Sequence, residues 1–128
     1  MKHLLFPLAL AAAGLAQSGG AQAQSWPARP LRLLVSYAPG GSTDISARVL
    51  APKLGDSLGQ QVIVDNRPGA NGIIATGVVA KSSPDGYTLI LVDSAHGANP
   101  ALYAKIPYDT ARDFASIGMV SQIGRAHV

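Results

Sequence analysis

Residues 31–64 read LRLLVSYAPGGSTDISARVLAPKLGDSLGQQVIV, and this segment indicates the fold class. It opens with an apolar run at residues 31–36, which has strand length and is typical of a parallel strand covered on both faces. Apolar residues then recur at helical spacing and predict a helix that Ser42 or Thr43 caps and that runs to about Leu58. Residues 62–64 predict a second strand. The apolar face of the helix contains Ala47, Leu50, Ala51, Leu54 and Leu58.

The residues after this segment repeat the alternation of strands and helices. A glycine-rich loop at residues 66–72 precedes a short helix at residues 73–81. A turn at residues 84–86 precedes a third buried strand at residues 88–92 (TLILV). The order strand, helix, strand, helix, strand predicts an α/β fold in which helices flank a parallel sheet.

The last part of the chain is less regular. We expect a loop rich in small residues at 93–99 and a helical turn at 100–103. Residues 109–114 are expected to be irregular, and residues 117–120 predict one more strand.

Two further expectations concern packing. Ile45 and Val49 form a second apolar strip on the first helix, so the first half of this helix should be covered on two sides. Tyr103 and Tyr108 are expected to pack against the edge of the domain. The chain has no cysteine, which excludes disulfides, a thiolate nucleophile and cysteine-ligated zinc.

The first 23 residues predict a cleaved secretory signal. Lys2 and His3 give a basic start, and an uncharged apolar run follows at residues 4–16. This run is shorter than the roughly 20 apolar residues that a membrane helix needs. Small residues in the sequence Ala21-Gln22-Ala23 suit a signal peptidase. We therefore expect an exported, periplasmic protein whose mature chain begins near Gln24.

The opposite end, residues 123–128 (IGRAHV), continues no pattern that precedes it. Its reverse translation resembles a common sequencing-library adapter. We therefore expect this end to be a non-native tail and residues 24–122 to be the domain.

The charge of this domain is nearly balanced. The whole chain has ten basic and seven acidic residues, and Lys2 and Arg125 lie outside residues 24–122, which leaves eight against seven. No run of lysine or arginine is present, and no aromatic residues interleave with basic ones. These features give no indication of a nucleic-acid partner.

The loop after the first strand is the main candidate for a binding site. Its sequence PGGSTD places Gly40, Gly41, Ser42, Thr43 and Asp44 at the start of a helix. Free N–H groups and the helix dipole favour an anion there, and glycine lets a ligand approach the main chain. The local pattern fits equally well a plain turn that Ser42 caps. In an open parallel sheet, ligands bind beyond the carboxyl ends of the strands.

The same loop excludes two nucleotide-binding motifs. Neither Gly-Lys-Ser/Thr nor Gly-x-Gly-x-x-Gly occurs there, which argues against a nucleotide-binding enzyme. A fixed carboxylate at Asp44 repels a dianion such as phosphate. It can accept hydrogen bonds from an ammonium group, a hydroxyl or an ordered water.

The loop after the third strand adds Ser94, Ala95 and His96 as candidates. A catalytic triad is disfavoured because no Gly-x-Ser-x-Gly elbow is present, and residues 24–122 hold no second histidine for a metal site. For His96, a structural hydrogen bond within its loop competes equally with a ligand contact. Asn66 and Arg67 could support the site, but an exposed capping role is the favoured interpretation.

Several motifs resemble one family when they are taken in order. They are WPARP at 26–30, PGGSTD at 39–44, DNRPGA at 65–70, PDGYTL at 84–89 and NPALY at 99–103. Together they resemble the substrate-binding proteins of tripartite tricarboxylate transporters, also called Bug receptors, over residues 26–122. Asp65 stands where that family more often has glutamate.

The resemblance implies a type II periplasmic-binding-protein fold, in which two α/β lobes close on a small carboxylated ligand. It implies that main-chain amides and bridging waters around Gly40, Gly41, Ser42, Thr43 and Asp44 hold the ligand carboxylate. The third loop, with the candidates named above, would contribute further contacts. Members of the family are much longer, so we expect residues 24–122 to be only part of the first lobe.

The function that follows is capture of a small organic carboxylate, without catalysis, metal or cofactor. The ligand classes are di- or tricarboxylates, acidic amino acids and aromatic acids. Where a transporter exists, its membrane subunits would be a further partner. The alternative is a fragment of an exported α/β hydrolase, which a serine nucleophile on a strand-to-helix elbow would distinguish.

Overall fold

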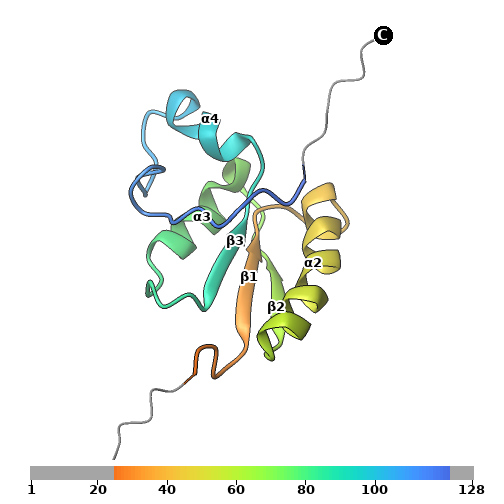
Figure 1. The fold of residues 1–128 in the computed structure, drawn as a ribbon. Coiled ribbons are helices and arrows are strands. Elements are labelled where there is room, and N and C mark those ends of the chain that lie inside the picture. The colour runs from red at the N-terminus through yellow and green to blue at the C-terminus, as the bar shows by residue number, and fades with distance from the viewer. Residues whose placement is uncertain (1–24, 122–128) are drawn as a thin grey trace, which may run out of the picture.

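A parallel three-stranded sheet forms the centre of the computed structural model, which describes residues 25–121 (Figure 1). Strand β1 (Leu31–Val35) lies in the middle and pairs with β2 (Val62–Asn66) and with β3 (Thr88–Leu91). The register aligns Leu33 with Val64 on one side and with Leu89 on the other. The predicted α/β class is confirmed. The signal-peptide and tail predictions lie outside the described residues.

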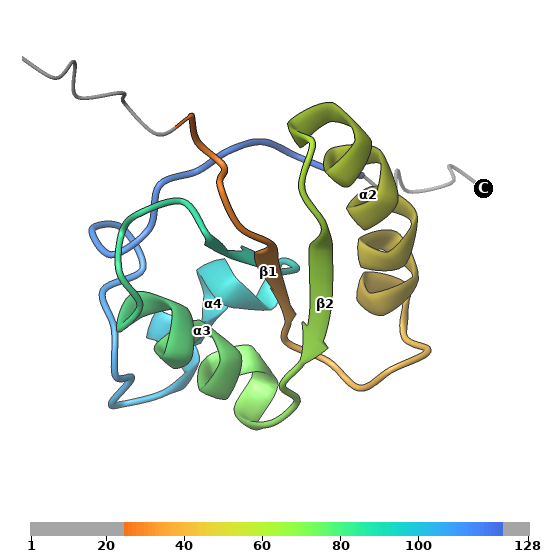
Figure 2. The same ribbon diagram turned by 90° about the horizontal axis from the view of Figure 1, so that it is seen from below.

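The two crossover helices cover opposite faces of the sheet (Figure 2). Helix α2 (Ser42–Leu58) connects β1 to β2, and helix α3 (Ile73–Ala80) follows a short 3-10 turn, η1 (Ala70–Gly72), and leads to β3. Ala47 and Ala51 are the inward residues of α2, and their small side chains let the helix lie close to the strands. Gly59 ends α2 in the left-handed conformation that glycine adopts without strain.

Strand β1 contributes more residues to the core than any other element. Leu31, Leu33, Leu34 and Val35 are at most 3% exposed, although they point alternately to the two faces of the sheet. This burial on both faces is the reason for the continuous apolar run in the sequence. Leu54 and Leu58 of α2 pack against the same core as partly buried residues.

The segment before β1 is fixed to the turn before β3. The Trp26 indole N–H donates to the Asp85 carbonyl at 3.1 Å, and the Ala28 N–H donates to the Tyr87 hydroxyl at 2.8 Å. The Arg29 guanidinium lies 4.0 Å from the centre of the Tyr87 ring and pairs with the Asp85 carboxylate. These contacts set where the chain enters the sheet.

Three sequence predictions about the later chain and the packing are wrong. Most of the loop expected at residues 93–99 belongs to a helix, α4 (Ala95–Leu102), whose end includes the expected turn. The strand expected at 117–120 does not form within the described residues, where Ile117 is 83% exposed. Ile45 and Val49 are also exposed, because α2 is covered on only one side by this part of the chain.

Of the two tyrosines expected at the edge of the domain, Tyr108 is buried and Tyr103 is exposed. No helix among residues 25–121 combines the length and the apolar character that a membrane span requires.

Candidate functional site

The loops that follow the three strands meet at one end of the sheet, because all three strands run in the same direction. The first loop leads into α2, the second into η1 and α3, and the third into α4. In Figure 1 the starts of α2 and α4 lie near the same end of the strands. This end is where the sequence placed the binding site.

The first loop enters α2 without a side-chain cap. Gly41 is the capping residue, with extended backbone, so the prediction that Ser42 or Thr43 caps the helix is wrong. Ser42 is exposed, and its N–H and that of Thr43 belong to the first turn, where no acceptor within the helix exists. Gly40 adopts a positive φ of 87°, which a residue with a side chain would adopt only with strain.

Asp44 is turned inward and holds the first loop in shape. Its carboxylate is 2% exposed and accepts the Gly40 N–H, the Arg48 Nε–H and the Asn66 amide, each at 2.9 Å. The hydrogen bonds from Arg48, Gly40 and Asn66 lower the pKa of Asp44 to about 2. Because these donors occupy the carboxylate, Asp44 positions the loop, and the Gly40 N–H points to Asp44.

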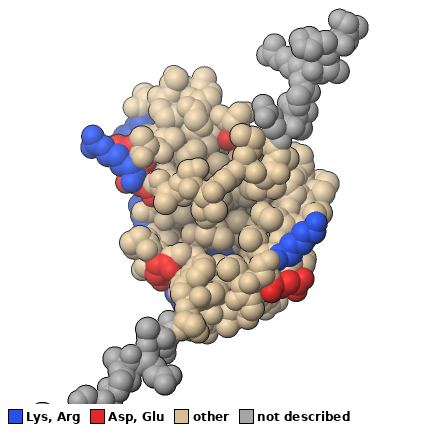
Figure 3. All heavy atoms as spheres, viewed as in Figure 1, with Lys and Arg blue, Asp and Glu red and all other residues tan. Residues whose placement is uncertain are grey.

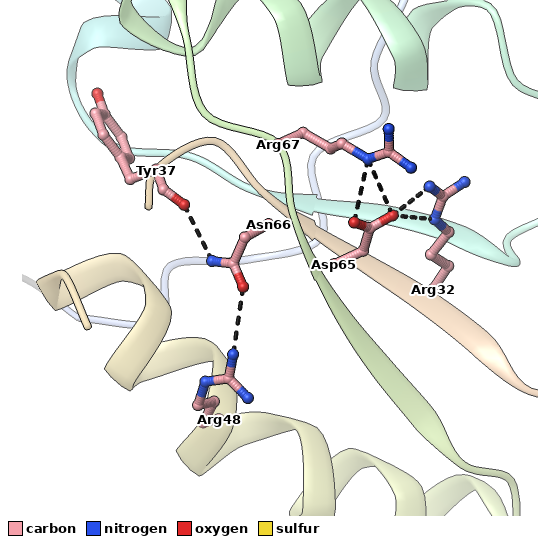
Figure 4. Close-up of polar contacts among 6 residues, drawn as sticks. All are labelled: Arg32, Tyr37, Arg48, Asp65, Asn66 and Arg67. Atoms are coloured by element: carbon pink, nitrogen blue, oxygen red, sulfur yellow. Dashed lines mark hydrogen bonds and ion pairs between the residues drawn. The ribbon is translucent and has the colours of Figure 1, made fainter. Parts of the chain in front are cut away.

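Asn66, at the end of β2, connects the second loop to the first. Its amide also donates to the Tyr37 carbonyl at 3.0 Å, and its oxygen accepts from Arg48 at 3.3 Å (Figure 4). The favoured interpretation of Asn66 as an exposed cap is therefore wrong. Sequence reasoning had one available signal for this network, the spacing of four residues between Asp44 and Arg48 on one helix face.

The neighbouring residue Asp65 lies between two arginines. Its carboxylate pairs with Arg32 of β1 and accepts from Arg67 Nε at 3.1 Å (Figure 4). The hydrogen bond from Arg32, with that from Arg67, lowers the pKa of Asp65. Arg67 thus fixes the start of the second loop and is exposed, as expected.

A reciprocal pair of amides joins the second loop to α4. Asn71 donates to the Asn99 side-chain oxygen at 2.9 Å, and the Asn99 amide donates to the Asn71 carbonyl at 3.0 Å. Asn99 is 1% exposed, and Asn71 adopts a positive φ of 52°. Neither residue was a candidate from the sequence, because the pairing depends on two loops that are distant along the chain.

His96 packs among aromatic side chains. Its ring stacks with Tyr108 at 6.0 Å between centroids and meets the Phe114 ring edge-on at 5.2 Å. Burial lowers the pKa of His96, so the neutral ring is favoured. The sequence left open whether His96 makes a structural hydrogen bond or contacts a ligand. The observed arrangement favours a structural role, but one that depends on ring packing and not on a hydrogen bond within the loop.

A hollow of about 750 Å³ lies between the first and third loops. Ser42, Thr43 and Ser94 are the candidate residues that line it, whereas Gly40, Gly41, Asp44, Ala95 and His96 do not. The rest of its wall comes from Ser46, residues 90–93 and the extended residues 116 and 118–121.

Asp93 is the only charged side chain among the described residues that line this hollow. The Asp93 carboxylate accepts the Ala95 N–H at 2.9 Å. Burial, together with a hydrogen bond from the Tyr37 hydroxyl to Asp93, raises the pKa of Tyr37 to about 12. The molecular face seen in Figure 3 is mostly uncharged. No lysine or arginine among the described residues lines the hollow, so an anion there would depend on N–H groups and hydroxyls.

A second hollow, of about 710 Å³, lies between α2 and β2. Its wall includes Pro52, Gly55 and Ile63, and none of the candidate residues contributes to it. Within residues 25–121, no three histidine, cysteine or acidic side chains are grouped as metal ligands would be.

Comparison with known proteins connects this geometry to a family of receptors. The family model of the tripartite tricarboxylate transporter family receptor (TctC) matches residues 46–127. Protein BugT of Bordetella pertussis is 46% identical over 116 residues, which cover 89% of this chain and 35% of BugT. A UPF0065 protein of Bordetella bronchiseptica is 46% identical over 101 residues, which cover 78% of this chain and 30% of that protein. The chain thus spans about a third of the length of these curated relatives.

Solved structures agree with the fold. The periplasmic binding protein BugD is 39% identical with a TM-score of 0.68, over 70% of this chain and 30% of BugD. MatC (Rpa3494) from Rhodopseudomonas palustris with bound malate is 39% identical with a TM-score of 0.64, over 70% of this chain and 31% of MatC. R. palustris Rpa4515 with adipate is 41% identical with a TM-score of 0.64, over 67% of this chain and 29% of Rpa4515. The sheet and its helices therefore match part of a periplasmic binding protein, as the sequence predicted.

Proposed function

The chain belongs to the family of tripartite tricarboxylate transporter receptors, and we propose that it forms part of the first lobe of a receptor that captures a small organic carboxylate. The family is one of receptors, which agrees with the prediction that the chain is not an enzyme and does not support the alternative of an exported hydrolase. Two similar structures contain malate and adipate, which are both dicarboxylates.

The observation that carries this proposal is the position of the start of α2 at the hollow. Ser42 and Thr43 line the hollow, and their N–H groups lie at the positive end of a 17-residue helix. Such a helix start favours an anion without requiring a cationic side chain. Ser94, on the third loop, also lines the hollow.

The location and the partners belong to the same proposal. The relatives in solved structures are periplasmic binding proteins, and a cleaved signal at residues 1–23 would export this chain to the same compartment. Where a cognate transporter exists, its membrane subunits would receive the ligand. Amino-terminal sequencing of the exported protein should begin near Gln24, and a mature protein that begins at Met1 would contradict export.

The binding site can be tested by removing one N–H group without removing the helix. Ser42 is the first residue of α2, a position that proline tolerates well, and Gly41 has the extended conformation that a residue before proline prefers. In a complete two-lobed receptor that contains residues 25–121, we expect Ser42→Pro to weaken binding of malate or adipate. The expected loss is about tenfold to a hundredfold, which corresponds to one hydrogen bond to a charged group.

Ser42→Ala is the matched control, because it removes the hydroxyl and keeps the N–H group. Calorimetric titration gives the affinity of both variants, and thermal melts without ligand check that α2 is intact. Equal affinity of the two variants, with equal melting temperatures, would place the carboxylate elsewhere.

A further inference from the structure

Two carboxylates stand on the loops beside the hollow, and they differ in what they can do. Asp44 is buried and engaged by three donors, so it offers little to a ligand. Asp93 is exposed and lines the hollow directly. Among the described residues that line the hollow, Asp93 has the only carboxylate that could take the acceptor role assigned to Asp44 from the sequence.

The Asp93 carboxylate is held in place and can accept further hydrogen bonds. It accepts the Ala95 N–H at 2.9 Å, which fixes it within its own loop. A carboxylate has about four acceptor sites, so about three remain for a ligand.

The positions of Ser42 and Asp93 in the wall of the hollow indicate how a ligand would be oriented there. Both line one hollow, Ser42 at the positive start of α2 and Asp93 at the end of β3. A ligand whose carboxylate is at Ser42 would present its other substituents to the Asp93 side. A negatively charged acceptor there favours a donor on the ligand and disfavours a group that has none.

We infer that Asp93 is a specificity-determining residue that accepts a hydrogen bond from a hydroxyl or ammonium group of the ligand. The site would then take hydroxy- or amino-substituted carboxylates in preference to plain dicarboxylates. This inference rests on the proposed function, because it needs the ligand carboxylate at the start of α2.

Three acids with the same four-carbon chain test it: succinate has no donor, malate has a hydroxyl and aspartate has an ammonium group. In the full-length protein, we expect malate or aspartate to bind at least about tenfold more tightly than succinate, a ratio that corresponds to about 1.4 kcal/mol. In Asp93→Asn we expect that ratio to fall toward one. Asparagine can still accept the Ala95 N–H through its side-chain oxygen, so the start of α4 is preserved.

Asp56→Asn is the control for net charge, because Asp56 is exposed near the far end of α2 and does not line this hollow. It should leave the ratio unchanged. An unchanged ratio in Asp93→Asn, or loss of succinate binding together with malate binding, would overturn the role of Asp93. Equal binding of all three acids by the unaltered protein would overturn this inference alone. Binding of none of them, with no effect of Ser42→Pro on any carboxylate, would overturn the proposed function with it.

Discussion

Asp44 and Asn66, which are 22 residues apart in the chain, are joined by a hydrogen bond of 2.9 Å from the Asn66 amide to the Asp44 carboxylate. The same amide donates to the Tyr37 carbonyl at 3.0 Å. The last residue of β2 therefore supports the loop that follows β1. The shape of the proposed carboxylate site depends on a residue that does not line it.

Replacing Asn66 should affect both stability and binding. Asn66→Leu keeps the number and branching of the side-chain heavy atoms but removes the donors to the Tyr37 carbonyl and to Asp44 Oδ1, which then lack this partner in a partly buried place. We expect the free energy of unfolding to fall by about 1–3 kcal/mol and the ligand affinity to fall as the first loop loosens. Chemical denaturation of the full-length protein measures the first effect, and calorimetric titration measures the second.

Gln61→Leu provides a control beside the other end of β2, because Gln61 directly precedes the strand and is exposed. This change should alter stability by no more than about 0.5 kcal/mol. If Asn66→Leu were as stable as the control and bound ligand equally well, the hydrogen bonds of Asn66 would not hold the loop.

His96 should make the protein sensitive to mild acid. Burial lowers its pKa in the folded state below the ordinary value of 6.5, so the unfolded chain takes up a proton first as the pH falls. Stability from the neutral, packed ring is therefore present above about pH 6.5 and is lost as the pH falls below it. His96→Phe retains an aromatic ring beside Tyr108 and Phe114 and should reduce this loss.

The measurement is the melting temperature of both proteins over a pH series. His96 is the only histidine among residues 25–121, which makes the comparison direct. A decline in mild acid that is identical in the two proteins would assign the sensitivity to another group.

Two glycines should respond to alanine with opposite signs. Gly86 has a φ of 80°, and a Cβ there would meet the Trp26 ring at 3.1 Å, so Gly86→Ala should destabilise the protein by about 1–2 kcal/mol.

Gly97 lies within α4, and no atom lies within 4 Å of the position that an alanine Cβ would take, so Gly97→Ala should stabilise the protein by about 0.4–1 kcal/mol. Denaturation curves of both variants test the pair, and a destabilised Gly97→Ala would argue against α4 as a helix.

Residues 25–121 in isolation should be marginally stable or associate. β2 and β3 each pair with one strand only in this part of the chain, and Ile45 and Val49 are exposed. Open edges and exposed apolar strips favour association between copies. A sharp, reversible melt that does not depend on protein concentration would contradict this expectation.

The sequence predicted the sheet and its first two helices because their signals are local. Leu31–Val35 is apolar at every position but one, and Gly59 marks the end of α2. Helix α4 was missed because Gly97 and Pro100 are typical of loops. Its start depends on the Asp93 turn, in which Asp93 accepts the N–H groups of Ala95 and His96. Tertiary contact at Asn99 then outweighs weak local propensity.

The candidate site was predicted in outline only. Ser42 and Thr43 of the motif line the hollow, and their role in binding stays a prediction. The different placements of Asp44 and Asp93 could not be read from the sequence, because they depend on contacts between loops: Asn66 binds Asp44 from the end of β2, whereas Asp93 is exposed at the hollow.

The hydrogen bonds between the loops also affect how much conformational entropy is lost when a ligand binds. The first loop is joined to the second through Asp44 and Asn66, and the second to α4 through Asn71 and Asn99. Immobilising a flexible side chain on binding costs about 0.5–1.5 kcal/mol, and folding has already ordered these groups. The loops that carry Ser42 and Ser94 are thus ordered before a ligand binds, so that ordering them takes little from the free energy of binding.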